Sequence, residues 1–422
     1  MYKKSKLSNG VTVITVPLKA TKTVTVLVLI KTGSKNEVDK NRGVSHFLEH
    51  MFFKGTGKRP TSLDLSKTLD SVGGVYNAFT GKEYTGFWTK VDADHTDLAL
   101  DVISDMLICS KFLQAEIDKE RGTIIEEMNM YLDNPIMYVP TLFENLLYSG
   151  QPLGNDEIGT RKTIASVMRK DFVDYYRKYY NGENIVVAVA GSFNEMNIKS
   201  SISKYFKPLN KRGSGKQADG YDEQKKPGIL INDRKTDQTH ICLGVRGYNM
   251  DHKDRYAINL LSIILGGNMS SRLFISVRER LGLAYYISTS AESYKHVGYF
   301  VTQAGVSNEK CKLAIEIILR EYKKFTTETI GDEELKKAKD YWKGRSMIAL
   351  ESSDSMANFV AMQELYSGKI LTPEERFAKI DKVTAADIKR VASDIFTEDK
   401  LNLAAIGPIK DEREIMNILN FN

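Results

Sequence analysis

Three residues that could hold and use a metal ion lie within one short stretch, Gly43–Gly55, which reads GVSHFLEHMFFKG. In an α-helix, His46 and His50 project from one face about one turn apart and can reach the same ion. Glu49 lies beside them, close enough to touch a water molecule on the metal without being a ligand. This HxxEH order is the inverse of HExxH, in which two His bind zinc and the Glu is a general base. The stretch therefore predicts a zinc site.

The alternative is an ordinary helix whose two His side chains are satisfied by hydrogen bonds. The chain has six His among 422 residues, so this spacing rarely arises by chance. Glu49 would also be an acid on a mostly apolar helix, where burial without a partner is costly. A metal ion accounts for all three side chains, and we favour it for that reason.

A catalytic zinc ion usually has three protein ligands, so two His call for a third, which is commonly a carboxylate. The predicted helix 114–133 carries four glutamates. Glu120 and Glu127 share a face, but about 10 Å of helix rise separates them, so they cannot both bind one ion. Glu126 is turned about 100° from Glu127. Spacing alone does not choose between these and Glu116, and the alternative is that all are solvated surface acids.

Apolar patterning predicts the elements that must position these residues. The strands and helices are mixed without strict alternation, which favours an α+β sandwich over a doubly wound parallel sheet. The predicted strands are 11–16, 24–30, 75–80, 84–91 and 184–190. The predicted helices are the HxxEH stretch, 63–72, 94–109, 114–133 and 171–180.

An internal repeat indicates the domain organisation. Residues 164–191 align with 380–407 without a gap, at an offset of 216 (380 − 164), and both copies read as a helix, a turn and an apolar strand ending in Gly. Two similar units that arose by convergence are the alternative. We interpret the repeat as duplication of a domain of about 200 residues.

The duplication predicts three segments along the chain. These are an N-terminal zinc-binding domain at 1–209, a polar linker at 210–227 and a C-terminal domain at 228–422. The second half has no HxxEH, and the corresponding helix, at 258–265, is mostly apolar. The predicted repeat is therefore symmetric in structure and asymmetric in chemistry.

Composition excludes several classes of protein. The net charge of +6 is spread over 60 basic and 54 acidic residues with no dense basic block, so we expect no nucleic-acid partner. The start of the chain lacks a signal-peptide pattern, and the apolar runs are too short to span a membrane. Cys109, Cys242 and Cys311 are scattered and odd in number, which favours a reducing compartment. We expect a cytoplasmic protein.

Four segments together resemble the pitrilysin/insulinase family of zinc peptidases, and most of all its branch of mitochondrial processing peptidase and bacterial relatives. They read HFLEHMFFKGT, GGVYNAFTGKEYTGF, ERGTIIEEM and MSSRLFISVRERLGLAYY, and they occur in order over both halves. In that family the third zinc ligand is the glutamate that ends an E-R-x5-E stretch. The resemblance implies Glu127 as this ligand and Glu120 as an acid that supports the site. We keep Glu126 as the fallback for the third ligand.

The resemblance also implies residues that contact substrate. An Arg and a Tyr seven positions apart match Arg278 and Tyr285, with Tyr286 as the alternative tyrosine. Both residue types can donate hydrogen bonds to a peptide carbonyl as it becomes an oxyanion. The family binds extended peptides by β-augmentation at an edge strand beside the zinc. The matching residues here are Asn77, Ala78, Phe79 and Thr80.

In fold and activity, the resemblance implies two homologous α+β domains, each a mostly antiparallel sheet with helices on one side. It implies a zinc-dependent endopeptidase in which Glu49 acts as general base and then as acid. Substrates would be unfolded peptides or short segments held in an enclosed chamber. The chain is half of the family's four-domain shell, so we expect a homodimer in which Arg278 and Tyr285 act in trans.

Two other functions compete with this interpretation. One is a non-catalytic partner subunit of a processing-peptidase-like heterodimer. Such subunits typically lose the HxxEH or the distal glutamate, and this chain has both. The other is a nucleic-acid or membrane-surface binder, which only the charge of +6 supports.

Overall fold

The computed structural model describes residues 2–421, which divide into two compact units. Unit 1 comprises residues 2–128, 155–218 and 347–372, and unit 2 comprises residues 129–154, 219–346 and 373–421. These bounds differ from the contiguous halves that we predicted. Residues 129–154 pack within unit 2 although they belong to the first half, and residues 347–372 pack within unit 1 although they belong to the second.

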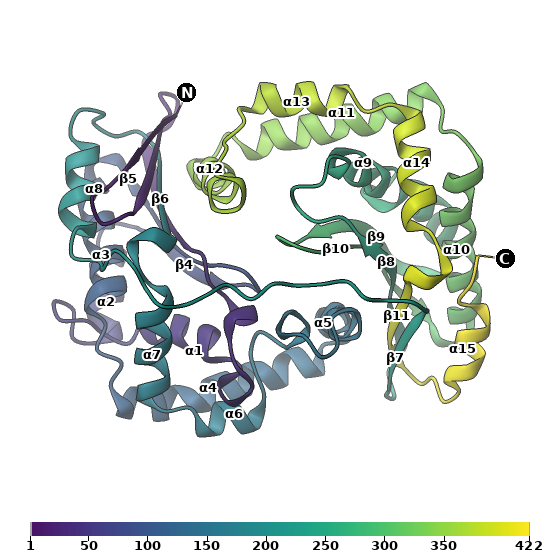
Figure 1. The fold of residues 1–422 in the computed structure, drawn as a ribbon, viewed down its shortest axis with the longest axis horizontal. Coiled ribbons are helices and arrows are strands. Elements are labelled where there is room, and N and C mark those ends of the chain that lie inside the picture. The colour runs from purple at the N-terminus through teal and green to yellow at the C-terminus, as the bar shows by residue number, and fades with distance from the viewer. Residues whose placement is uncertain (1, 422) are drawn as a thin grey trace. The chain divides into compact units, whose positions relative to one another are not determined.

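Unit 1 is built on a six-stranded sheet with the order β1-β2-β6-β3-β5-β4 (Figure 1). Its strands are β1 (Lys3–Lys6), β2 (Thr12–Pro17), β3 (Thr23–Ile30), β4 (Val75–Thr80), β5 (Thr85–Asp92) and β6 (Ile185–Gly191). Its helices are α1 (Val44–Phe52), α2 (Ser62–Asp70), α3 (Thr96–Cys109), the first part of α4 (Gln114–Asp133), α6 (Arg161–Ser166), α7 (Arg169–Tyr179), α8 (Ile198–Phe206) and α12 (Ser353–Ser367).

Unit 2 is built on a five-stranded sheet with the order β7-β11-β8-β10-β9. Its strands are β7 (Gly228–Asp233), β8 (Gln238–Gly247), β9 (Ala284–Ser293), β10 (Gly298–Ser307) and β11 (Leu401–Gly407). Its helices are α5 (Pro135–Leu147), α9 (Arg255–Gly266), α10 (Cys311–Thr327), most of α11 (Asp332–Ala349), α13 (Pro373–Asp381), α14 (Ala385–Ile395), α15 (Glu412–Ile418) and the π-helical η6 (Phe274–Arg280).

The two sheets share one topology once β1 is set aside. Each has a single parallel pair, in which Thr12 faces Val186 in unit 1 and Gly228 faces Asn402 in unit 2. Gly228 lies 216 positions after Thr12 (228 − 12), and Asn402 lies 216 positions after Val186 (402 − 186). This is the offset of the sequence repeat. The remaining pairs are antiparallel. The predicted α+β class with two related domains is confirmed.

Helices cover both faces of each sheet, so the prediction of helices on one side was wrong. In unit 1, Leu27 and Leu29 of β3 pack with α12. Val28, on the opposite face, pairs with Phe87 of β5, whose ring packs edge-on against Phe52 of α1. In unit 2, α5 packs on one face of the sheet while α9 and α10 pack on the other. Both faces of each sheet are apolar, and both must be shielded from water.

The sequence did not predict α5 or α12, the helices that cover these second faces. Helix α4 ends at Asp133 as predicted, but the next helix, α5, begins two residues later at Pro135. The side chain of Asn134 caps α5 by accepting a hydrogen bond from the backbone of Met137, and Pro135 takes the first helical position, where a missing N–H costs nothing.

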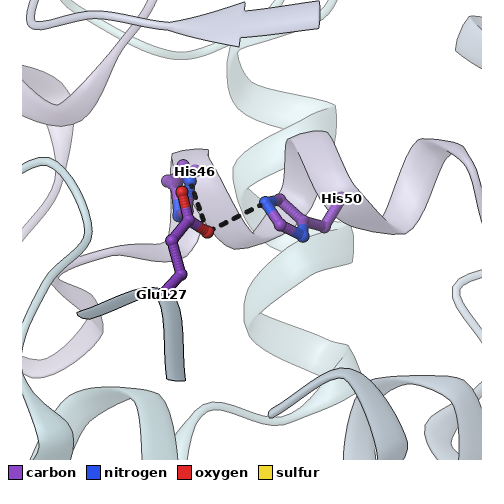
Figure 2. A group of neighbouring side chains, drawn as sticks. All are labelled: His46, His50 and Glu127. Atoms are coloured by element: carbon purple, nitrogen blue, oxygen red, sulfur yellow. Dashed lines mark ion pairs between the residues drawn. The ribbon is translucent and has the colours of Figure 1, made fainter. Parts of the chain in front are cut away.

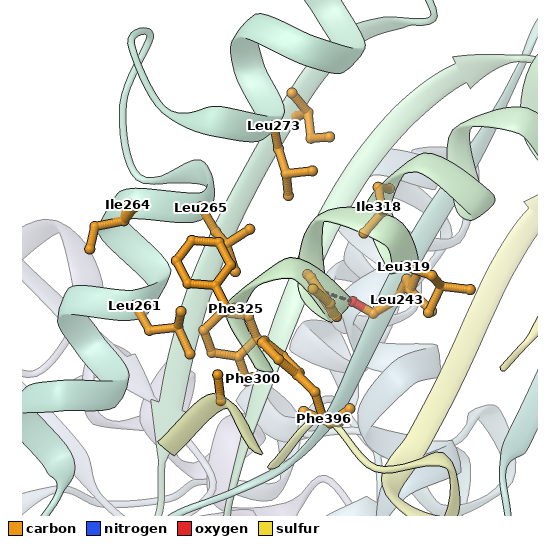
Figure 3. Close-up of a cluster of buried hydrophobic side chains, with 14 of the residues drawn as sticks. Leu243, Leu261, Ile264, Leu265, Leu273, Phe300, Ile318, Leu319, Phe325 and Phe396 are labelled. Atoms are coloured by element: carbon orange, nitrogen blue, oxygen red, sulfur yellow. Dashed lines mark hydrogen bonds between the residues drawn. The ribbon is translucent and has the colours of Figure 1, made fainter. Parts of the chain in front are cut away.

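The main core of unit 2 lies between its sheet and α9, α10 and α14 (Figure 3). Leu261, Ile264 and Leu265 of α9 are buried there with Phe300 of β10 and Phe325 of α10. The helix that follows the first strands of unit 2 therefore contributes apolar side chains only to packing. Among residues 2–421, no helix combines the length and apolar character that a membrane crossing requires.

Candidate metal centre

The apolar side of helix α1 packs against the rest of unit 1. Phe47, Leu48 and Met51 are almost completely buried, and the Phe47 ring packs edge-on against Phe172 of α7 with ring centroids 5.0 Å apart. Because these residues fix the rotation of the helix, the side chains of His46 and His50 project together toward α4 (Figure 2).

Glu127 of α4 meets both histidines. Its Oε2 lies 3.5 Å from Nε2 of His46 and 3.5 Å from Nε2 of His50 (Figure 2). One atom from each of the three residues lies within 4.8 Å of the others, which makes them a group that could hold a metal ion. Zinc bonds of about 2.0–2.1 Å in a tetrahedral site place neighbouring ligand atoms roughly 3.3 Å apart. The two distances from Glu127 are close to this value, and the group as a whole could hold such an ion.

The other glutamates of α4 lie outside this group of ligands. Glu126 is exposed and is not part of it. Glu120 is buried behind His50, where its Oε1 lies 3.0 Å from the His50 Nδ1 and its Oε2 is 2.5 Å from the Lys54 ammonium. A carboxylate on the second ring nitrogen fixes the tautomer and orientation of a metal-binding imidazole. Glu120 thus contacts the second ring nitrogen of His50.

The electrostatics of the centre favour charged carboxylates and a basic imidazole. The hydrogen bond with His46 is the main cause that holds the pKa of Glu127 below its usual value, and burial opposes it. Burial acts to lower the pKa of His46, but the hydrogen bond with Glu127 and the charges of Glu127 and Glu49 outweigh burial and raise it. For Glu120, burial is outweighed by hydrogen bonds from His50 and Lys54, so its pKa is lowered.

Glu49 lies beside the three candidate ligands and is not one of them. Burial raises the pKa of its carboxyl group, against a hydrogen bond from Thr80 and the charges of the two histidines. The Thr80 hydroxyl donates to Glu49 Oε2 over 2.5 Å. A carboxylate whose pKa is raised toward neutrality is better suited to accept a proton and return it.

The residues predicted to bind substrate backbone lie at the edge of the unit 1 sheet. Strand β4 pairs only with β5 and ends the sheet. Thr80 points toward α1, as its contact with Glu49 requires, so Ala78 shares that face while Asn77 and Phe79 lie on the other. The strand that contacts Glu49 is therefore also the one whose outer edge can accept another strand.

Arg278 and Tyr285 both lie in irregular backbone of unit 2. Arg278 is in the π-helical η6, with its guanidinium 4.7 Å from the centre of the Phe274 ring. Tyr285 is on the edge strand β9 at a register shift, between Tyr286, which pairs with Gly305 of β10, and Ala284, which pairs with Val306, and it is 74% exposed. Such bulges turn a side chain out of the regular alternation and often occur near active sites.

Tyr286, the alternative tyrosine, is held within the sheet of unit 2. Its hydroxyl lies 3.1 Å from Nδ1 of His240, and their rings stack. The ring lies over Gly305, where an added Cβ would come within 2.4 Å of it. Tyr286 thus has a structural partner, while the exposed Tyr285 is the tyrosine available to a ligand.

Sequence reasoning missed Glu37. This residue is 5% exposed, and its carboxylate accepts hydrogen bonds from the backbone N–H groups of Gly43 and Ser45 and from the Ser45 hydroxyl. Burial raises its pKa to about 7, although these hydrogen bonds act in the opposite direction. It precedes α1 by seven positions, outside the spacing of a capping box, so no local pattern marks it.

Comparison with known proteins covers nearly the whole chain. Residues 12–161 match the family described as insulinase (peptidase family M16), and residues 166–341 match the peptidase M16 inactive domain. The uncharacterized zinc protease YmxG of Bacillus subtilis is 34% identical over 410 residues, which are 97% of this chain and 98% of that protein. An uncharacterized zinc protease of Rickettsia felis is 33% identical over 96% of this chain and 97% of its own length.

Solved structures are also similar over the full length. A protease from Helicobacter pylori superposes with a TM-score of 0.91 at 26% identity, covering 97% of this chain and all of that one. A chain of complex III from Candida albicans superposes with a TM-score of 0.84 at 18% identity, covering 99% of each chain, and shows likeness of fold alone. The family and the names of these relatives imply zinc as the metal for the His46, His50 and Glu127 group.

Proposed function

This chain belongs to the insulinase family of peptidases, family M16, and we propose that it is a zinc-dependent metalloendopeptidase. The observation that carries the proposal is the meeting of His46, His50 and Glu127 at separations that fit zinc, with Glu49 beside them. Zinc bound there supplies an acidified water and polarises the scissile carbonyl of a peptide bond.

Glu49 performs the proton transfers in this mechanism. Its carboxylate accepts a proton from the attacking water as the oxygen bonds to the carbonyl carbon. It then donates that proton to the amide nitrogen as the C–N bond breaks, which releases an amine and a carboxylic acid. Thr80 holds one carboxylate oxygen by a hydrogen bond.

We propose that the substrate is an unfolded peptide or short segment that pairs with the outer edge of β4 through Asn77, Ala78, Phe79 and Thr80. Main-chain hydrogen bonds along a strand edge recognise extended conformation more than sequence. Because Ala78 and Thr80 point to the side of Glu49, a paired peptide is delivered along the strand that contacts the general base.

We further propose that Arg278 and Tyr285 bind the substrate carbonyl and that the chain forms a homodimer in which this pair acts on the zinc site of the other subunit. The exposure of Tyr285 and its place at a bulge support a ligand-binding role. One chain carries both the candidate ligands and the pair, so two copies supply two complete sites.

The dimer proposal is tested by mixing Glu49→Gln protein with Tyr285→Phe protein under conditions of subunit exchange. If the pair acts in trans, each mixed dimer has one intact site, and activity rises above that of either variant alone. If the pair acts in cis, both subunits of a mixed dimer remain defective, and no activity returns.

The activity is tested by cleavage of an unstructured peptide with wild type and Glu49→Gln, with zinc quantified in both. We expect cleavage by wild type only and about one zinc per chain in each protein, because Glu49 is not a ligand. Zinc without cleavage by wild type would favour a non-catalytic subunit. Absence of zinc from both proteins after supplementation would refute the metal centre.

A further inference from the structure

The two histidines of the candidate centre are oriented in different ways. Nδ1 of His50 lies 3.0 Å from the Glu120 carboxylate, which fixes that imidazole directly. Nδ1 of His46 is buried and has no hydrogen-bond partner among residues 2–421. A ligand imidazole without a partner on its second nitrogen must be oriented by something other than its own hydrogen bond.

The backbone that carries His46 is the first turn of α1, and Glu37 holds that turn. Glu37 Oε2 accepts from the Gly43 N–H over 2.7 Å, and Oε1 accepts from the Ser45 N–H over 2.8 Å and from the Ser45 hydroxyl. These N–H groups belong to the helix start, where no intrahelical carbonyl is available. Gly43 itself has no side chain with which to cap the helix.

The turn is also confined from the other side. Gly43 adopts φ 88°, and an added Cβ would come within 2.5 Å of the Ile158 carbonyl oxygen. The residue directly before α1 thus has packed backbone on one side and the buried Glu37 carboxylate on the other. His46 follows Ser45 directly, so the direction of its Cα–Cβ bond is set by this anchored segment.

We propose that Glu37 is a positioning residue of the metal centre, which acts through the backbone of Gly43 and Ser45 to aim His46 at the ion. Glu37 orients His46 indirectly, through the backbone, whereas Glu120 orients His50 by direct contact. The proposal rests on the zinc site proposed above and concerns how that site is built.

The corresponding helix of unit 2 supports a link between this anchor and the metal ligands. Helix α9 begins after Asp254, whose side chain caps no backbone N–H of the helix. Its carboxylate instead pairs with both terminal nitrogens of Arg390, at 2.8 and 2.7 Å. Within residues 2–421, the Asp254 carboxylate at the start of α9 accepts no backbone hydrogen bond from that helix, whereas the buried Glu37 carboxylate accepts two at the start of α1.

The test is the zinc affinity of Glu37→Gln, measured by competition with a chelator on the full-length chain. Glutamine keeps the shape of glutamate, but its amide group cannot accept from all three donors. Zinc affinity is expected to fall about tenfold to a hundredfold, the range found when groups that orient ligands are removed. The absorption spectrum of bound Co²⁺, which reports ligand geometry, is expected to change as well.

Asp105→Asn is the matched control, because it also converts a buried carboxylate of unit 1 to an amide. Asp105 accepts from Thr56 over 2.5 Å and from Arg59 over 2.9 Å, away from the first turn of α1. Its variant should lose stability in urea while zinc affinity and the Co²⁺ spectrum stay at wild-type values. An equal loss of affinity in both variants would show a general effect of stability and overturn the proposal.

Unchanged affinity and spectrum in folded Glu37→Gln would overturn the proposal and leave the zinc site standing. Failure of wild type to bind zinc would refute the site and the proposal together. If Glu37→Gln does not fold, Ser45→Ala removes only one of the three donors and should weaken zinc binding by about threefold. No change in that variant would overturn the proposal.

Discussion

The sheets of the two units follow the same plan, and unit 1 adds the strand β1. Sheet order and the register of the parallel pair are repeated from unit 1 to unit 2. Where α1 presents His46, Glu49 and His50, the corresponding helix α9 places Leu261, Ile264 and Leu265 in the core. Buried apolar side chains therefore maintain the fold in both units. The candidate chemistry of unit 1 depends on a few polar side chains that are not needed for this packing.

The units also differ in where they use irregular backbone. In unit 1 the candidate ligands project from two regular helices, which suits a metal that requires fixed distances. In unit 2 Arg278 and Tyr285 come from a π-helical turn and a strand bulge. Unit 1 has the features of a rigid metal centre, and unit 2 offers side chains that irregular backbone turns outward.

The largest effect on zinc affinity is expected at Glu127, for which Glu126 provides a matched control. Glu127→Gln should reduce zinc affinity by at least about a hundredfold and abolish cleavage, because a neutral amide is a poor zinc ligand. Glu126→Gln, one position away and exposed, should bind zinc as wild type does. Competition with a chelator measures both. Equal losses in the two variants would contradict the assignment of Glu127.

A smaller effect is expected from unit 2, at Tyr285. Tyr285→Phe should lower kcat about a hundredfold, the cost of removing one donor to a developing oxyanion, and should leave zinc content unchanged. Tyr286→Phe removes the hydrogen bonds of the Tyr286 hydroxyl with His240 and Gln303 and should cost about 1 kcal/mol of stability with little change in kcat. The opposite ranking would assign the substrate contact to Tyr286.

The smallest expected effect is a pH dependence of stability, which has opposite signs for His46 in unit 1 and His240 in unit 2. In the metal-free protein the pKa of His46 is raised, so its contribution to stability is present below about pH 6.5 and is lost as the pH rises further. Burial lowers the pKa of His240, so its contribution is present above about pH 6.5 and is lost as the pH falls.

Urea unfolding of His46→Gln and His240→Gln at several pH values measures this difference. Relative to wild type, the His46 variant should be least stable at low pH, and the His240 variant should gain relative stability there. Parallel curves for the two variants would show that the two histidines have similar surroundings.

Much of this architecture was predictable because its causes are local. The i, i+4 spacing of His46 and His50 needs only a helix to bring the two rings together. The offset between 164–191 and 380–407 predicted the duplication that the strand registers repeat. The bounds of α4 followed from its composition and from Asn134-Pro135 after it.

The prediction of helices on one side failed because it depended on contacts between distant segments. α5 belongs to the first half of the sequence and packs on the sheet of unit 2, while α12 belongs to the second half and packs on that of unit 1. The periodicity of a helix shows that it has an apolar face, but it does not identify the sheet that this face will cover.

By itself, the sequence predicted the type of chemistry, since two His at i, i+4 project from one face of a helix with Glu49 beside them. Without a family resemblance it left the third ligand open, since Glu120 and Glu127 share one face of α4 about 10 Å apart along the helix and Glu126 points in another direction. Tertiary packing placed Glu127 against both His rings. It also brought Glu37 to the start of α1. The hydrogen-bond partners of a buried carboxylate depend on which groups lie near it in the fold, and sequence spacing does not reveal them.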